Sequence, residues 1–82
     1  MKTNYKLQSE FNELKNDIEK WKWVKDNQDT GIIIYLDNDD TFGTLPDPED
    51  KEDVLYFQFS EYIGYHGVQN LLEAYGIKAD FV

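Results

Sequence analysis

Ile32-Ile33-Ile34-Tyr35-Leu36 is the longest uninterrupted apolar run in the chain and the clearest indication of its fold. Its β-branched and aromatic residues favour a strand, and five residues are far too few to cross a bilayer. A second apolar run covers residues 54–59, in which Leu55, Phe57 and Phe59 face one way and the residues between them face the other. The two runs predict two strands of a small sheet.

The segment before the first strand predicts an amphipathic helix. Its apolar residues recur at spacings of 4, 3, 4 and 3, at Leu7, Phe11, Leu14, Ile18 and Trp21. Thr3 or Asn4 can cap its start by accepting a backbone N–H. We expect this stripe to pack against the sheet, with a homodimeric coiled coil as the alternative. Residues 21–25 partly alternate and leave open a first strand in place of the helix end.

The remaining elements follow from turn residues and periodicity. Residues 41–45 form a candidate third strand weakened by Gly43, and two prolines then mark a loop running to residue 53. A helix is predicted over residues 67–75, with Gly76 in the left-handed position after it and Ile77 making the following apolar contact. Residues 79–82 are a candidate edge strand. We therefore predict an α+β fold with an N-terminal amphipathic helix, a small antiparallel sheet of three to four strands and a C-terminal helix.

Composition narrows the class of protein. The chain has 82 residues, no cysteine, no arginine and a formal net charge of -9, and its size fits a single small acidic domain over residues 1–82. Without cysteine there is no disulfide or thiolate–metal chemistry. The acidic balance and the missing arginines disfavour direct binding to nucleic acid or to anionic lipid. We expect a cytoplasmic protein, because no secretory signal is apparent, and either a monomer or a homodimer.

One segment suggests a binding partner. Residues 37–53 carry eight carboxylates against one lysine, a local charge of -7. We predict that these carboxylates contact a basic protein surface, and we add two tyrosines from the glycine-flanked segment after the last long strand because tyrosine is enriched at interface hot spots. The predicted partner-binding residues are Asp37, Asp39, Asp40, Asp47, Glu49, Asp50, Glu52, Asp53, Tyr62 and Tyr65.

Catalytic and metal sites are not expected. Asp37, Asp39 and Thr41 match alternate positions of an EF-hand loop, but Phe42 replaces the required glycine and Pro48 the final glutamate. Ser60 and His66 are close in sequence, yet no nucleophile elbow surrounds the serine. Capping or loop roles are favoured for both, so we predict no enzyme activity, no cofactor and no metal.

The size, the charge and the lack of a recognisable catalytic set indicate only a general class of function. This profile is similar to that of phage- or mobile-element-encoded inhibitors, including DNA mimics, anti-restriction and anti-CRISPR proteins, although no sequence motif carries the likeness. We predict an acidic inhibitor that binds a nuclease or another basic nucleic-acid-binding protein. The alternatives are a small adaptor domain with an apolar interface and an immunity protein to a basic nuclease toxin. A cation-dependent module is a further alternative, which calcium-dependent melting would reveal.

Overall fold

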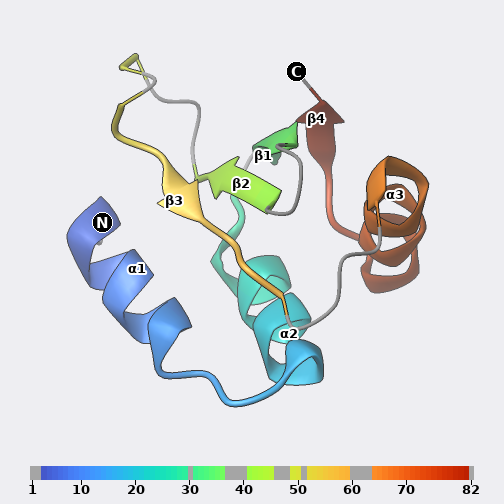
Figure 1. Ribbon diagram of the computed structural model, residues 1–82, viewed down its shortest axis with the longest axis horizontal. Coiled ribbons are helices and arrows are strands. Elements are labelled where there is room, and N and C mark those ends of the chain that lie inside the picture. The colour runs from blue at the N-terminus through green and yellow to red at the C-terminus, as the bar shows by residue number, and fades with distance from the viewer. Residues whose placement is uncertain are drawn as a thin grey trace.

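The computed structural model describes residues 3–29, 31–36, 41–45, 49–50, 52–59 and 64–81, which form an α+β fold. Three helices and a four-stranded sheet make up this part of the chain (Figure 1). In chain order the elements are α1 (Asn4–Asn12), α2 (Asp17–Asn27), β1 (Ile32–Leu36), β2 (Thr41–Thr44), β3 (Leu55–Tyr56), α3 (Gly64–Tyr75) and β4 (Ala79–Phe81). Among the described residues, no helix has the length and apolar character needed to cross a membrane.

The sheet is mixed, which corrects the antiparallel sheet expected from the sequence. Its strand order is β3-β2-β1-β4. The pairs β1–β2 and β2–β3 are antiparallel, whereas β1 and β4 run parallel, with Ile32 opposite Ala79 and Ile34 opposite Phe81. Parallel neighbours need a crossover connection, and α3 immediately precedes β4 on that side of the sheet (Figure 1). The C-terminal strand therefore lies at an edge, as expected, but it runs parallel to its neighbour and not antiparallel.

The N-terminal helical region also differs from the expected single helix. It is divided into α1 and α2, because Asn16 adopts an extended conformation and its side chain accepts a hydrogen bond from Glu19 N at 2.9 Å, which starts a new helix. Of the two predicted caps, Thr3 and Asn4, it is Thr3 that caps α1, because its hydroxyl accepts a hydrogen bond from Lys6 N. The change in helix direction places Ile18 at the surface, with 60% of it exposed, so the continuous stripe is wrong at this residue.

The core lies between the helices and one face of the sheet. Helix residues such as Phe11, Trp21 and Val68 pack there with Ile34 and Phe57. The alternation expected for residues 54–59 is confirmed, although only Leu55–Tyr56 pairs as a strand. Of the remaining large aromatics, Trp23, Phe59 and Tyr75 are partly buried against this core. Trp21 stacks on Phe59 with ring centroids 4.2 Å apart, and most of the aromatic side chains whose burial the structure describes pack in or against the core.

Gly43 explains how β2 and residue 57 approach each other. A Cβ atom built at Gly43 would overlap the ring of Phe57, which is only 1% exposed. The glycine that weakens the strand prediction is therefore required for packing, since it leaves room for a buried ring over the sheet.

Helix α3 ends as the sequence predicts, although it begins at Gly64, three residues before the predicted start at residue 67. Gly76 has φ of 71°, and its N–H donates to Glu73 O at 3.1 Å while Ile77 N–H donates to Leu72 O at 2.8 Å. This pair of bonds is the Schellman arrangement, and the buried Ile77 side chain supplies its apolar contact.

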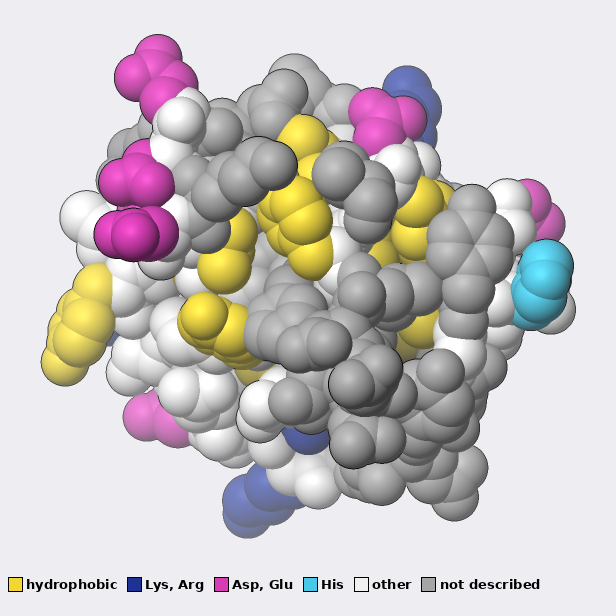
Figure 2. Space-filling model, turned by 45° about the horizontal axis from the view of Figure 1, so that its top comes forward, with side chains coloured by type: hydrophobic (Ala, Val, Ile, Leu, Met, Phe, Trp, Pro, Cys, Tyr) yellow, Lys and Arg dark blue, Asp and Glu magenta, His cyan; other side chains and the backbone are white. Residues whose placement is uncertain are grey.

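The second face of the sheet lies away from the helices. Ile32 and Ile34 belong to the core cluster, whereas Ile33 and Tyr35 between them are partly exposed. Tyr56 on β3 is 45% exposed. Figure 2 turns the top of the molecule forward and shows hydrophobic side chains in the middle of this view, with acidic side chains around its edge. The fold thus positions both apolar and negatively charged groups at the surface.

Candidate partner-binding surface

Four of the predicted acidic residues lie in described parts of the connection between β2 and β3. Glu49, Asp50, Glu52 and Asp53 are all exposed. Asp53 N donates to Asp50 O at 3.0 Å, and Glu52 N donates to the Asp50 carboxylate at 2.9 Å. The Asp50 side chain therefore shapes a local turn, as aspartate commonly does. The turn presents its carboxylates to solvent in a defined arrangement.

Helix α1 holds the end of this acidic turn and the strand that follows. Asn4 Nδ2 donates to Asp53 O at 2.8 Å. One turn further along the helix, Gln8 Oε1 accepts from Tyr56 N at 2.7 Å and Gln8 Nε2 donates to Tyr56 O at 3.1 Å. One side chain thus satisfies both backbone groups of Tyr56. Because β3 is an edge strand, these bonds also close that edge to pairing with another strand.

Two exposed tyrosines lie on the elements next to the acidic turn, one on α1 and one on β3. Tyr5 is 86% exposed in the first turn of α1, next to Asn4. At 100° per residue, Tyr5 lies beyond Asn4 and Gln8 on the side of α1 away from buried Leu7. Tyr56 lies on β3, and its backbone contacts the Gln8 side chain. In Figure 2 acidic side chains gather at the upper left, where Figure 1 shows the connection between β2 and β3.

The other predicted partner-binding residues are placed only in part. Tyr65 lies in the first turn of α3 by its backbone. The structure thus brings together one half of the predicted acidic set with two tyrosines that the prediction omitted. The exposure of both tyrosines could have been predicted from the sequence. Tyr56 alternates with the inward-facing residues of its strand, and Tyr5 lies off the apolar stripe that contains Leu7 and Phe11. Outside the described residues lie Asp37, Asp39, Asp40, Asp47 and Tyr62.

Of the residues considered for catalysis and metal binding, the structure describes His66 and Thr41. His66 is exposed in α3, inside the helix and not before it, and Thr41 begins β2. Ser60 and the EF-hand-like residues 37–40 lie outside the described residues. Within the described ranges, no group of three or more His, Asp or Glu side chains is arranged to hold a metal ion.

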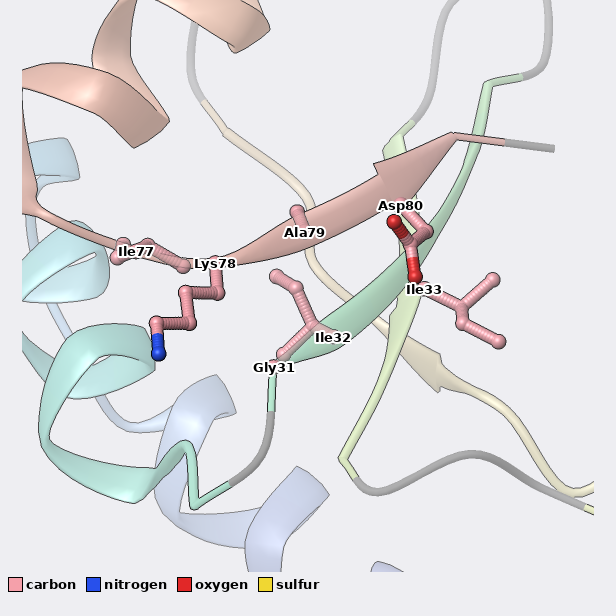
Figure 3. A pocket seen from close by; sticks show the side chains of 7 residues that line it. All are labelled: Gly31, Ile32, Ile33, Ile77, Lys78, Ala79 and Asp80. Carbon is pink, nitrogen blue, oxygen red and sulfur yellow. The ribbon is translucent and has the colours of Figure 1, made fainter.

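A pocket of about 530 Å³ lies where β1 and β4 begin. Gly31 forms part of its lining, and a Cβ atom there would come within 3.1 Å of Lys78 O, so the close backbone approach favours glycine. Figure 3 shows the Lys78 side chain extending away from the Asp80 carboxylate. The two charges thus do not converge on a common point, and the other lining residues are glycine, alanine and isoleucine. This geometry offers no catalytic pair.

The described residues form a small acidic α+β fold in which the carboxylates of the turn and two tyrosines are exposed. Comparisons of the chain with protein-family models, curated proteins and solved structures found no match.

Proposed function

We propose that this protein is a non-enzymatic inhibitor that binds a basic protein which handles nucleic acid, such as a nuclease, and obstructs its nucleic-acid site. One observation carries the proposal: Glu49, Asp50, Glu52 and Asp53 are exposed on a turn held by its own hydrogen bonds and by α1. A held row of carboxylates loses less conformational freedom on binding than a flexible acidic tail would.

Electrostatics supports a basic partner. The chain has a net charge of -9, and thirteen of its seventeen acidic residues lie in residues 26–82 against two lysines. Complementary fields accelerate association and disfavour partners of like charge. The acidic turn places four exposed carboxylates within five residues, and each strand of duplex DNA likewise carries a negative charge about every 3.4 Å. Such a surface is suited to occupy a channel that normally holds phosphates.

The test is retention of a partner from host lysate by the immobilised protein at about 50 mM and about 500 mM salt. We expect a basic nucleic-acid enzyme to be retained at low salt, released at high salt and displaced by duplex DNA. The purified partner should also lose activity when the protein is added. Retention of a partner that neither salt nor DNA displaces would contradict the proposal.

A charge-matched pair of variants makes the test specific. The first variant neutralises the acidic turn with Glu49→Gln, Asp50→Asn, Glu52→Gln and Asp53→Asn, which keep an acceptor oxygen at residue 50. The control removes four other exposed carboxylates, with Asp26→Asn, Asp29→Asn, Glu73→Gln and Asp80→Asn. Both have the same net charge, so we expect loss of partner binding in the first only. Equal loss in both would show a dependence on net charge and not on this turn.

A second candidate function is an adaptor domain with an apolar interface. The observation in its favour is Ile18, which is 60% exposed on α2 at a distance in sequence from the acidic turn. An apolar interface would resist high salt. If Ile18→Asp abolished retention while the neutralised acidic turn did not, the adaptor function would replace the inhibitor.

A further inference from the structure

The acidic turn and the two exposed tyrosines lie on segments that α1 joins by hydrogen bonds, and we name this set of residues the tyrosine–carboxylate surface. Its continuity comes from α1, since Asn4 contacts the turn at Asp53 and Gln8 contacts β3 at Tyr56. Tyr5 lies in the first turn of α1, beside Asn4. The surface consists of Tyr5, Glu49, Asp50, Glu52, Asp53 and Tyr56.

We infer that this surface recognises arginine side chains of a protein partner, in preference to lysine. Arginine combines the two interactions that the surface offers, because its planar guanidinium stacks on an aromatic ring and pairs with a carboxylate through two N–H groups. Lysine is a compact and more strongly hydrated charge without that planar geometry. The inference rests on the proposed function and adds the chemical class of the group that is bound.

The negative charge of the tyrosine–carboxylate surface indicates that it binds positively charged side chains. Four carboxylates lie within five residues of the chain, at 49, 50, 52 and 53, and all four are exposed. Tyr5, which is 86% exposed, follows Asn4 on α1, and Tyr56, which is 45% exposed, lies three residues after Asp53. An arginine-bearing surface therefore matches both the sign of the charge and the apolar area.

The mode of contact follows from the closed strand edge. Both backbone groups of Tyr56 are bonded to Gln8, so a partner strand cannot extend the sheet at this residue without displacing that side chain. The partner therefore approaches this side of the molecule with side chains and not with backbone hydrogen bonds. Side-chain recognition is the mode in which the difference between arginine and lysine matters most.

Two labelled peptides of equal length, one of arginine and one of lysine, provide the probes. Their affinities for the intact protein are measured by fluorescence anisotropy at low salt. We expect the arginine peptide to bind more tightly. In the double variant Tyr5→Ala and Tyr56→Ala, its binding should weaken roughly five- to thirtyfold, because an exposed cation–π contact contributes about 0.5–1 kcal/mol at each ring. Binding of the lysine peptide should change less than about threefold.

Controls separate this inference from the proposed function. Ile18→Ala also removes an exposed apolar side chain and should leave both affinities unchanged. Tyr5→Ala alone serves if the double variant does not fold, and it should lose part of the arginine preference. An unchanged ratio of the two affinities in the tyrosine variants would overturn the inference. If the neutralised acidic turn still abolished partner binding in that case, the proposed function would stand; if it did not, both would fail.

Chemical shifts provide a second readout. Addition of the arginine peptide should shift the ring resonances of Tyr5 and Tyr56 more than those of Tyr75, which is partly buried against the core. Shifts confined to residues away from the tyrosine–carboxylate surface would place the bound peptide elsewhere and overturn the inference.

Discussion

Two glycines are required for different physical reasons. Gly43 is needed for space, because the Phe57 ring occupies the position that its Cβ atom would take. Gly76 is needed for conformation, because its φ is 71° and a Cβ atom there would meet no atom within 4 Å. The sequence does not show why either residue is glycine. The structure shows that Gly43 is needed for packing and Gly76 for its backbone conformation.

Substitution at Gly43 should be the more damaging. Gly43→Ala places a methyl group against a ring that is 1% exposed, inside a packed core. We expect unfolding free energy to fall by roughly 1–3 kcal/mol, as overpacking usually causes, measured by urea denaturation. In a protein that already carries Phe57→Leu, Gly43→Ala should lower the unfolding free energy by less than it does in the parent. Additive effects of the two changes would contradict the packing explanation.

Substitution at Gly76 should cost less. Gly76→Ala forces a side chain into the left-handed region, for which we expect a loss of about 1–2 kcal/mol. Gly76→Asn should lose less than Gly76→Ala, because asparagine adopts this conformation more readily. Thermal unfolding of the three proteins measures the order. An alanine variant as stable as the parent would contradict the cap assignment.

A buried aromatic residue gives the largest single effect. Phe57 contacts the rings of Phe11 and Trp23, with centroids 5.3 and 6.2 Å away. Phe57→Ala should therefore cost roughly 3–5 kcal/mol, a large share of the stability of a small domain. We expect loss of the cooperative unfolding transition in circular dichroism. Tyr5→Ala, at an 86% exposed residue, is the control that should retain it.

At the scale of elements, the association of α1 with β3 combines apolar packing and edge hydrogen bonds. Leu7 and Phe11 bury one side of the helix, and Gln8 bonds to the backbone of Tyr56. Edge strands need such protection because their unpaired backbone groups invite pairing with another chain. A strand of only two residues thus remains in the sheet with the support of a neighbouring helix.

The Gln8 contact can be tested by two substitutions. Gln8→Ala removes both bonds to Tyr56 and should cost about 1–2 kcal/mol, with faster hydrogen exchange at the Tyr56 amide. Gln8→Glu keeps the acceptor for that amide and loses the donor to Tyr56 O, so its exchange should remain closer to that of the parent. Equal exchange in all three proteins would show that the contact does not protect the edge.

At the scale of the whole molecule, the net charge of -9 acts against compactness. We expect the melting temperature to rise as sodium chloride increases from about 20 to about 200 mM, since salt screens repulsion between exposed charges. The neutralised acidic turn should melt no lower than the parent, because its four residues are exposed. A lower melting temperature would indicate that these carboxylates stabilise the fold, which would conflict with a purely binding role.

Local sequence patterns were sufficient to predict the α+β class, the strand at Ile32–Leu36, a helix cap at Thr3 or Asn4 and the Gly76 cap, because each depends mainly on residues within a few positions of one another. Sequence patterns over a few residues do not indicate which strands pair or in which direction they run. The tertiary structure decided the parallel pairing of β4 with β1, the exposure of Ile18 and the closed edge at Tyr56. These features depend on contacts such as Gln8 with Tyr56, 48 positions apart in the chain, and on packing between elements that no local pattern encodes.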